Sequence, residues 1–476
     1  MPIPPHPVEA CPTPGAGPWE AKARDLVAKA LENTRWRQSE CINLIPSEQT
    51  ASPAVRRLSL MDPAFRYAEH RPLPAFMDAE VFYYQGTDFI AGVEAMLNAE
   101  MARYLGCCEV EARVISGQMA NTVVYSALLD YLNRNDRKAE PRRIRSVVNN
   151  HIVRGGHLSA QPMGALRDFI RVDPRLEKPA VVNFPVLPEN PYKIDVEAAK
   201  TIIAEDRPEL IIFGKSMVLH REPISEISTF LREQGIDAVI MYDMAHVLGL
   251  VGPHFQEPFA EGADLVTGST HKTFFGTQRG IVAANWREEE KRYALWETVR
   301  SRTFPGSVSN HHLGTLLGLL MAVYEMNAFR DDYQRAVIQN AKAFARALSD
   351  AGLAVAGDPA ISFTETHQVI VKVEYAKAVE AARRLEANNI ICNYQAAPDE
   401  EGFTAAGALR MGVQEMTRFG MEPDDFRQLA GYISEALAGR TSKEEVTAFR
   451  RRFLAMRYCF ADEAFGGLME TLHRMV

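Results

Sequence analysis

An acid, two histidines and a lysine follow two successive apolar runs near the middle of the chain. The first run ends in Asp243, with His246 three residues later, and the second leads to His271 and Lys272. In open α/β sheets ligands bind at the carboxyl ends of the strands, so we expect these side chains to meet at one edge of a sheet. Taken singly, Asp243 fits a helix cap and Lys272 a solvated charge equally well. Taken together, they favour a joint site.

These side chains suit an aldehyde cofactor that contains a pyridine nitrogen. A lysine amine forms a Schiff base with an aldehyde when partial desolvation leaves the amine uncharged and nucleophilic. A carboxylate such as that of Asp243 pairs with the protonated ring nitrogen, so that the ring can accept carbanion electrons. The sequence therefore predicts a cofactor of this type on Lys272.

Two glycine-containing segments upstream are candidates for holding the rest of such a cofactor. Ser116, Gly117 and Gln118 stand before a helical stretch, where free N–H groups and the helix dipole favour phosphate. A simple serine N-cap explains the same pattern. The pair at 155–156 precedes His157, whose flat ring suits stacking on another ring, although a structural histidine also fits.

Arg410 lies in an apolar run that reads as a strand of the C-terminal part. A buried arginine needs a partner, and its planar fork suits a carboxylate. The α-carboxylate of an amino-acid substrate and an internal Asp or Glu are equally good partners on the sequence alone.

Strands and helices alternate through the middle of the chain, which predicts an α/β fold with a mostly parallel sheet. The runs are rich in β-branched residues and apolar throughout, as strands buried on both faces should be. The predicted strands are 112–115, 146–148, 180–184, 210–213, 238–242, 265–266 and 280–284, and predicted helices between them include 119–132, 196–204 and 224–234.

The pattern changes after about Asn310 to that of a smaller α+β domain. Helical stretches at 313–326 and 329–351 end at Gly352, a residue typical of a helix stop. Strands are predicted at 369–373, 390–392 and 408–413, with helices at 377–387, 424–438 and 443–457. We therefore divide the chain into an N-terminal arm and helix (1–45), a large cofactor-binding domain (46–312), and linking helices with a small C-terminal domain (313–476).

Composition narrows the function classes. The 476 residues include 53 Lys and Arg and 61 Asp and Glu, so the net formal charge is −8. This net charge argues against a nucleic-acid binder and against a basic surface for membranes. No run of 18 apolar residues predicts a membrane span. The six cysteines lack metal-ligand spacing, so we expect no metal site and a reduced, cytoplasmic setting. The first 19 residues read as a Pro-rich flexible arm rather than a signal peptide.

Together these segments resemble serine hydroxymethyltransferase and its relatives, pyridoxal-phosphate enzymes of the aspartate-aminotransferase-like fold. The resemblance runs from about Cys41 to Cys459. Its most specific parts are Asp-Met-Ala-His at 243–246 and Thr-His-Lys-Thr at 270–273. Further matching segments are 43–53, 66–69, 83–86, 116–117, 155–157 and 409–413.

The resemblance implies a role for each matching residue. Lys272 would hold pyridoxal phosphate, Asp243 would contact its ring nitrogen, His157 would stack on the ring, and His246 would sit near the ring hydroxyl. Ser116, Gly117, Gln118, Ser216, Thr270 and His271 would complete the cofactor site, and Ser47 and Arg410 would bind the substrate carboxylate. Tyr67, Glu69 and Tyr83 would come from the partner subunit of a homodimer, or of a tetramer, with Glu69 managing protons.

The chain departs from the family pattern in the phosphate segment and at the entrance for folate and substrate. Gln118 replaces a serine of the Ser-Gly-Ser pattern, and residues 70–82 form an extra stretch where the family shapes its folate and substrate entrance. Two other segments, 363–369 and 412–418, resemble the folate-independent threonine transaldolases. Tetrahydrofolate is therefore only a possible co-substrate.

We expect a transferase that acts on serine- or glycine-type amino acids by Cα–Cβ aldol or retro-aldol chemistry. Hydroxymethyl transfer in one-carbon metabolism comes first. The alternatives are a folate-independent threonine transaldolase or β-hydroxy-amino-acid aldolase, another reaction of the same cofactor such as transamination or decarboxylation, and a non-catalytic scaffold.

Overall fold

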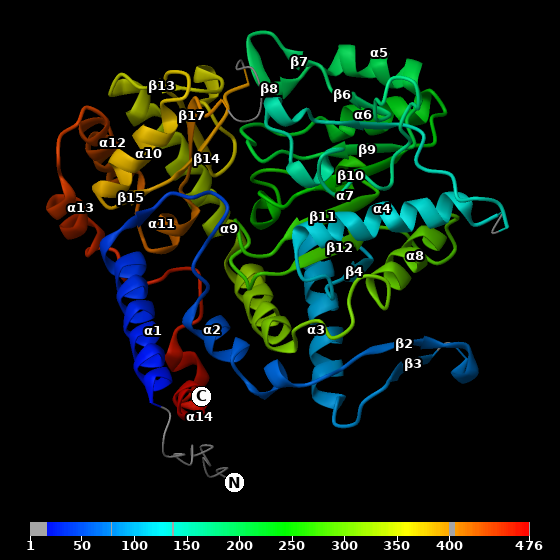
Figure 1. The fold of residues 1–476 in the computed structure, drawn as a ribbon, viewed down its shortest axis with the longest axis horizontal. Helices are drawn as coiled ribbons and strands as arrows, with labels where there is room; N and C mark the ends of the chain where they lie inside the picture. Colours follow the sequence, from blue (N-terminus) through cyan, green and yellow to red (C-terminus); the bar gives the residue numbers. More distant parts are fainter. Residues whose placement is uncertain (1–16, 78, 136–137, 399–404, 476) are drawn as a thin grey trace.

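Two α/β units lie side by side in the computed structural model, which describes residues 17–77, 79–135, 138–398 and 405–475. Figure 1 shows the larger unit at the right and the smaller unit at the left, with helix α9 (Leu313–Asp350) between them. The predicted Pro-rich arm falls almost entirely on residues 1–16, outside the described part of the chain.

Within the described residues, the larger unit is built on a seven-stranded sheet of order β4-β12-β11-β10-β9-β5-β6. Strand β12 runs antiparallel to both neighbours, and the other pairs are parallel, which confirms the predicted mostly parallel α/β sheet. The strands are β4 (Glu109–Glu111), β5 (Val147–Asn149), β6 (Val181–Asn183), β9 (Leu210–Phe213), β10 (Val239–Asp243), β11 (Leu265–Ser269) and β12 (Gly280–Ala284).

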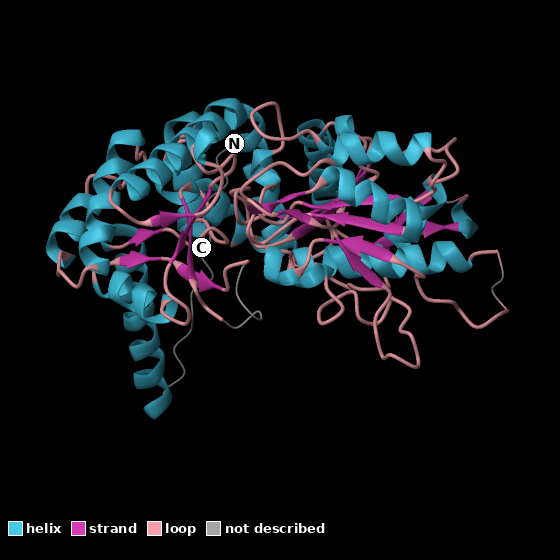
Figure 2. Ribbon diagram, turned by 90° about the horizontal axis from the view of Figure 1, so that it is seen from above, coloured by secondary structure: helices cyan, strands magenta, loops and turns pink. Residues whose placement is uncertain are grey.

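Side chains alternate between the two faces of this sheet, and each face has its own core. Leu210 and Ile212 pack with α4 (Gly117–Asn133) and α8 (Tyr293–Thr303), whereas Ile211 and Phe213 pack on the opposite side. Because both faces are covered, as Figure 2 shows, the strands are apolar throughout. Helices on the second side are α3 (Asp88–Leu105), α5 (Val196–Asp206), α6 (Ile224–Glu233), α7 (Pro258–Glu261) and part of α9.

The described residues of the smaller unit form an antiparallel four-stranded sheet of order β13-β14-β17-β16. Its strands are β13 (Ala354–Val355), β14 (Gln368–Lys372), β16 (Asn393–Gln395) and β17 (Ala408–Gly412). Its helices are α10 (Ala378–Ala387), α11 (Gln414–Arg418), α12 (Pro423–Leu437) and α13 (Lys443–Arg450).

Four predicted elements differ from the structure. The strand predicted at 112–115 is not formed, and the edge strand β4 lies just before it, at Glu109–Glu111. The two helical stretches after 313 form one helix, α9, because no breaker separates them. The strand predicted at 390–392, β15 (Ile390–Ile391), pairs in parallel with β1 (Ile42–Asn43) instead of joining the small sheet. Helix α13 ends at Arg450, whose buried guanidinium donates to the carbonyls of Cys41 and Gln38.

The extra stretch at 70–82 is a hairpin of β2 (His70–Leu73) and β3 (Ala79–Phe82) that extends away from the body below α8 (Figure 1). The remaining elements are α1 (Pro18–Arg35), α2 (Pro53–Ser59), α14 (Leu468–Met475), β7 (Val186–Leu187) and β8 (Asn190–Ile194). None of the helices in the described ranges is long and apolar enough to cross a membrane.

Candidate active site

Lys272 is buried at the carboxyl end of the sheet with no acidic partner. It follows β11 by three residues, and only 9% of its surface is exposed. Its Nζ lies 3.2 Å from Nε2 of His246, and in the described part of the chain no carboxylate forms an ion pair with it. Burial lowers the pKa of Lys272 to about 8, with Asp243 opposing and Arg410 adding to the shift. The amine is therefore poised to be nucleophilic.

His246 presents its own N–H to this lysine. Gln368 Nε2 lies 3.5 Å from Nδ1 of His246 and donates to the carbonyl of Ser216. The amide nitrogen of Gln368 can only donate, so when Lys272 is uncharged Nδ1 accepts and the ring proton is on Nε2, facing the amine. Burial and the nearby cations hold the pKa of His246 well below its usual value, so the ring stays neutral.

Asp243, the last residue of β10, is a buried carboxylate held in its ionised form. Its Oδ2 accepts from His157 Nδ1 at 2.5 Å, Asn121 Nδ2 at 2.7 Å and Ser159 Oγ at 3.2 Å, and its Oδ1 accepts from the backbone of Ala245. Burial opposes ionisation, but these donors outweigh it and lower the pKa of Asp243 to about 2.

Close backbone packing places His157 beside Asp243. A Cβ on Gly156 would meet the carbonyl of Asn150 at 2.2 Å, and Gly155 has φ +87°, a backbone that only glycine adopts readily. The imidazoles of His157 and His246 lie 5.7 Å apart and nearly perpendicular, at 84°. The two glycines thus bring His157 into the cluster as the sequence predicted.

Arg410, in β17, reaches the same cluster from the smaller unit. Its Nε donates to Asn393 Oδ1 at 3.1 Å and its Nη1 to the carbonyl of Ser216 at 2.7 Å. Burial lowers the pKa of Arg410 to about 10. In the described residues no Asp or Glu pairs with it, so the internal-acid alternative finds no support.

The charges of this cluster fit an anionic cofactor and an anionic substrate. Lys272 and Arg410 are buried cationic groups, and Asp243 is the one ionised acid that acts on Lys272 electrostatically. An excess of buried positive charge is costly unless a ligand neutralises it. Pyridoxal phosphate and a substrate carboxylate both supply that negative charge.

The predicted phosphate segment begins a helix beside these residues. Ser116 caps α4 by accepting the N–H of Met119 at 3.1 Å, which leaves its hydroxyl hydrogen to donate elsewhere. A Cβ on Gly117 would meet Ser269 Oγ at 2.3 Å, so the helix start packs directly on the end of β11. Gln118 is exposed. The N–H groups of this first turn have no partner within the helix.

The other predicted residues near Lys272 lie in the same region. Thr270 accepts the N–H of Arg279 and donates to the carbonyl of Thr277. Next to it, His271 is half-buried with an unpaired Nδ1, and burial lowers its pKa to about 4. Ser47 follows Pro46, whose carbonyl accepts from His367 Nε2.

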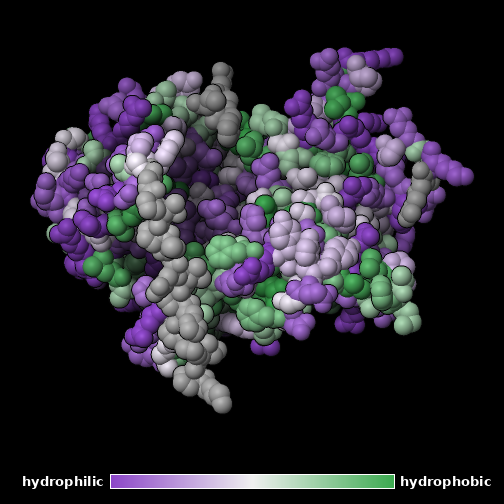
Figure 3. Space-filling model, turned by 60° about the horizontal axis from the view of Figure 1, so that its bottom comes forward, coloured by the Kyte–Doolittle hydropathy of each residue, from purple (hydrophilic) through white to green (hydrophobic). Residues whose placement is uncertain are grey.

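Tyr67, Glu69 and Tyr83 form a second group with Tyr84 at the base of the hairpin. Tyr67 and Tyr83 are 53% and 44% exposed, and the rings of Tyr67 and Tyr84 lie 5.3 Å apart. The structure records no contact between this group and Lys272 within the described residues. Figure 3, which brings the lower side of Figure 1 forward, shows apolar residues gathered near the middle of this face. Exposed apolar side chains on either side of the hairpin in the sequence include Leu60, Phe65, Phe89 and Met96.

Four further residues of the cluster were not predicted as site residues, although Gln368 lies in the segment 363–369 singled out above. Asn121 and Ser159 hold Asp243, and Asn121 also accepts from Thr267 Oγ1 at 2.6 Å. Gln368 orients His246, and Asn393 orients Arg410. The polar interruption of the apolar pattern at Asn121 and Gln368 was the available signal.

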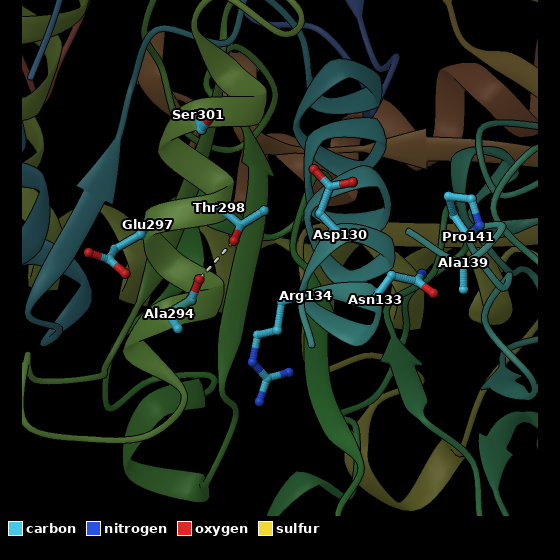
Figure 4. A pocket seen from close by; sticks show the side chains of 9 residues that line it. All are labelled: Asp130, Asn133, Arg134, Ala139, Pro141, Ala294, Glu297, Thr298 and Ser301. Carbon is cyan, nitrogen blue, oxygen red and sulfur yellow. Dashed lines mark hydrogen bonds between the residues drawn. The ribbon is translucent and has the colours of Figure 1, made fainter. Parts of the chain in front are cut away.

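One hollow in the described part of the surface lies away from this cluster. Figure 4 shows it between α4 and α8, a hollow of about 720 Å³. Asp130 and Arg134 project from one helix and Glu297 and Thr298 from the other. None of the predicted site residues lines it.

Comparison with known proteins gives the family. The serine hydroxymethyltransferase model matches residues 21–433. A serine hydroxymethyltransferase of Pyrobaculum calidifontis is 36% identical over 442 residues, covering 92% of this chain and 94% of the relative. That of Korarchaeum cryptofilum is 35% identical over 456 residues, covering 94% and 98%. The crystal structure of L-threonine transaldolase from Pseudomonas fluorescens has the same fold, with a TM-score of 0.79 at 24% identity over 95% of this chain and 98% of that one. The chain belongs to the serine hydroxymethyltransferase family of pyridoxal-phosphate-dependent transferases.

Proposed function

We propose that this chain makes and breaks the Cα–Cβ bond of a small β-hydroxy amino acid, with hydroxymethyl transfer from serine to a folate-type carrier as its first reaction. The observation that carries the proposal is a pair of buried basic groups, Lys272 and Arg410, that form no ion pair with an acid of the described residues and lie beside the ionised Asp243. The names of the archaeal relatives support this choice of reaction.

Lys272 and Asp243 would hold the cofactor from two sides. Pyridoxal phosphate, when bound, supplies an aldehyde carbon for covalent attachment and a ring that delocalises the electron pair of the broken bond. Lys272 would provide the attaching amine, and Asp243 would hold a proton at the ring nitrogen. His157, fixed by Asp243, would lie against the ring, and neutral His246 would lie near the ring hydroxyl.

The remaining cofactor contacts would come from the carboxyl ends of the strands. Ser116, Gly117 and Gln118 at the start of α4 would bind the phosphate through their N–H groups and the serine hydroxyl. The residues we assign to the rest of the cofactor site are Ser216, Thr270 and His271.

Arg410 would bind the α-carboxylate of the substrate, with Ser47 beside it. Asn393 and the Ser216 carbonyl already occupy Nε and one N–H of Nη1. The free N–H groups of Nη1 and Nη2 then remain for a carboxylate. By holding the carboxylate, Arg410 would also orient the bonds of the substrate Cα.

Tyr67, Glu69 and Tyr83 would complete the site of a second subunit in a homodimer. The exposure of Tyr67 and Tyr83 supports this assignment, as does the lack of a recorded contact between this group and Lys272 among the described residues. Glu69 would move the proton of the substrate hydroxyl, a task that suits a carboxyl group at a subunit boundary.

A second candidate, folate-independent transfer to another aldehyde, is favoured by Gln368. This residue lies in a segment that resembles the transaldolases, and it contacts both His246 and the Ser216 carbonyl. The hairpin at 70–82, next to Glu69 and Tyr83, also distinguishes the acceptor side of this chain.

Product analysis separates these reactions. The purified protein, loaded with pyridoxal phosphate, is incubated with serine with and without tetrahydrofolate, and with threonine plus aldehydes. Glycine formed from serine only with tetrahydrofolate supports the first proposal. Acetaldehyde released from threonine without any effect of folate supports the second. Conversion of the cofactor to its amine form, without glycine, would contradict both.

A further inference from the structure

The hairpin at 70–82 is tied to the body of the protein at its base. His70 pairs with Phe82 at the base of the hairpin. The residues just before and after this pair are also joined, because the N–H of Tyr83 donates to the carbonyl of Glu69 at 3.0 Å. Whatever fixes His70 therefore fixes the backbone of both Glu69 and Tyr83.

His70 is clamped between two carboxylates from different elements. Its Nδ1 lies 2.5 Å from Oε1 of Glu80 in β3, and its Nε2 lies 2.5 Å from Oε2 of Glu94 in α3. Its ring also stacks on Phe82, with centroids 4.4 Å apart. The contact with Glu80 is a hydrogen bond, and the contact with Glu94 is an ion pair that lacks hydrogen-bond geometry. Because a neutral imidazole has only one N–H, carboxylates beside both ring nitrogens favour the doubly protonated cation.

The contacts continue from Glu94 towards the segment that carries Lys272. Oε1 of Glu94 lies 2.7 Å from Nε2 of His311, and Arg279 Nη2 lies 3.3 Å from Nδ1 of that ring. The backbone N–H of Arg279 donates to Thr270 Oγ1. His311 accepts from Arg279 and is therefore neutral, which leaves His70 as the cation that balances Glu94.

The other charges around His70 have partners of their own. Arg113 donates to the carbonyl of His70 at 3.2 Å and pairs with Glu111 through two hydrogen bonds. Arg300 in α8 pairs with the second oxygen of Glu80 at 3.0 Å. These groups, with Glu80, Glu94 and His311, are the titratable and charged side chains that face His70.

We propose that His70 is a positioning residue whose imidazolium fixes the Glu69–Tyr83 rung and so sets where these two side chains reach. This inference rests on the proposed function, which gives Glu69 and Tyr83 their role. It assigns a task to a stretch that the family resemblance left unexplained.

The clamp depends on pH in one direction. Although burial opposes it, contact with Glu80 and Glu94 raises the pKa of His70 to about 9. The pKa of His70 in the unfolded chain is about 6.5. The stabilisation is therefore complete below pH 6.5 and is lost as the pH rises through about 9. Above that pH one carboxylate loses its N–H partner and the rung loosens.

The test compares His70→Gln with His70→Arg in the cofactor-loaded protein. Glutamine removes the cation, whereas arginine keeps a permanent cation with several donors, and a cavity of about 60 Å³ beside His70 gives it room. We expect His70→Gln to lower kcat about 100-fold, the scale of a small misplacement of catalytic groups. The absorbance of the bound cofactor should not change. The wild type should lose activity as the pH rises through about 9, and His70→Arg should retain activity without this alkaline fall.

Full kcat in His70→Gln would overturn the inference, as would an unchanged alkaline fall in His70→Arg if the glutamine variant does not fold. Nitrogen NMR of the His70 ring provides a readout other than activity: both nitrogens should be protonated at pH 8, and a neutral ring would contradict the clamp. The variant Glu69→Gln separates the proposed role of Glu69 from the proposed role of His70. If this variant keeps full activity, the proposed role of Glu69 fails, whereas the protonation state of His70 still tests the clamp.

Discussion

Two buried lysines follow strands of the same sheet that flank β10, and their surroundings differ. Lys215 follows β9, and its Nζ lies 3.1 Å from Oε1 of Glu222 and donates to the carbonyl of Tyr192 at 2.8 Å. The side chains of Lys215 and Glu222 are 2% and 0% exposed. Lys272 follows β11 and has the imidazole of His246 where Lys215 has a carboxylate.

The difference shows how the same residue type serves structure at one strand end and chemistry at another. The buried ion pair Lys215–Glu222 engages the amine in structural contacts with a carboxylate and a backbone carbonyl. For Lys272, which has no ion-paired acid among the described residues, burial is the largest cause that lowers its pKa to about 8; Arg410 adds to this shift and Asp243 opposes it. Burial without an ion-paired carboxylate is what marks Lys272 as a nucleophile.

The contrast would fail if mutation of Lys215 and mutation of Lys272 had the same effect on cofactor binding and turnover. We expect Lys272→Ala to abolish the absorbance of covalently bound cofactor and to lower turnover by about 10³- to 10⁶-fold, as loss of a covalent catalyst does. The measurement is the visible spectrum and the rate of glycine formation.

The matched control is Lys215→Met. It should keep the cofactor absorbance but lose on the order of 3–5 kcal/mol of unfolding free energy, because Glu222 is left as an unpaired buried charge. Urea denaturation measures this loss. A Lys215 variant that loses the cofactor while staying fully stable would contradict the contrast.

Asp243→Asn sharpens the comparison by removing the anion nearest to Lys272. The isosteric amide keeps the shape but cannot hold a proton at the cofactor ring nitrogen, so turnover should fall by about 10²- to 10³-fold. Steady-state kinetics with serine or threonine measure the fall. Ser159→Ala, which removes the longest of the three side-chain donors to the carboxylate, serves as the milder control. Unchanged kcat in Asp243→Asn would contradict the assignment.

The two lysines should also differ in how their removal changes stability with pH. Between about pH 8 and 10.5 Lys272 is protonated in the unfolded chain but neutral in the folded one, so stability rises with pH there. Cofactor-free Lys272→Met should therefore be more stable than the wild type near pH 7, by at most about 3 kcal/mol. The gain should vanish above pH 10.5. Thermal unfolding at a series of pH values tests this, and a destabilised variant at pH 7 would argue against the uncompensated amine.

Arg410→Lys tests the second cation and has the smallest expected effect. The charge remains but the planar fork is lost, so the KM for the amino acid should rise roughly 10-fold, the value of one charge-assisted hydrogen bond. The cofactor absorbance should stay. Asn393→Ala, which frees Nε of the same guanidinium, should raise KM less. A fall in kcat with constant KM would point away from carboxylate binding.

Much of the fold was predictable because short apolar runs rich in β-branched residues mark the strands clearly in the sequence. Strands β9 and β12 have the predicted bounds, since both are short β-branched runs buried on two faces. Strand β15 was predicted as a strand, but its pairing with β1 was not, because that partner lies about 350 residues away and carries no local signal.

The site divides in the same way. Asp243 and Lys272 were predictable because each follows an apolar strand, and parallel strands deliver their ends to one edge. The contacts of Asn121 with Asp243 and of Gln368 with His246 depend on how α4 and β14 pack, which no spacing in the sequence encodes. The reach of Glu69 and Tyr83 depends on a second subunit and stays a prediction.

The most direct test of the account is chemical trapping of the cofactor. The loaded protein is reduced with borohydride, digested, and the peptides are examined by mass spectrometry for a pyridoxyl group. We predict the modification on Lys272, with Lys215 unmodified. A pyridoxyl group on Lys215, or on no lysine of a protein that has bound the cofactor, would contradict the central claim.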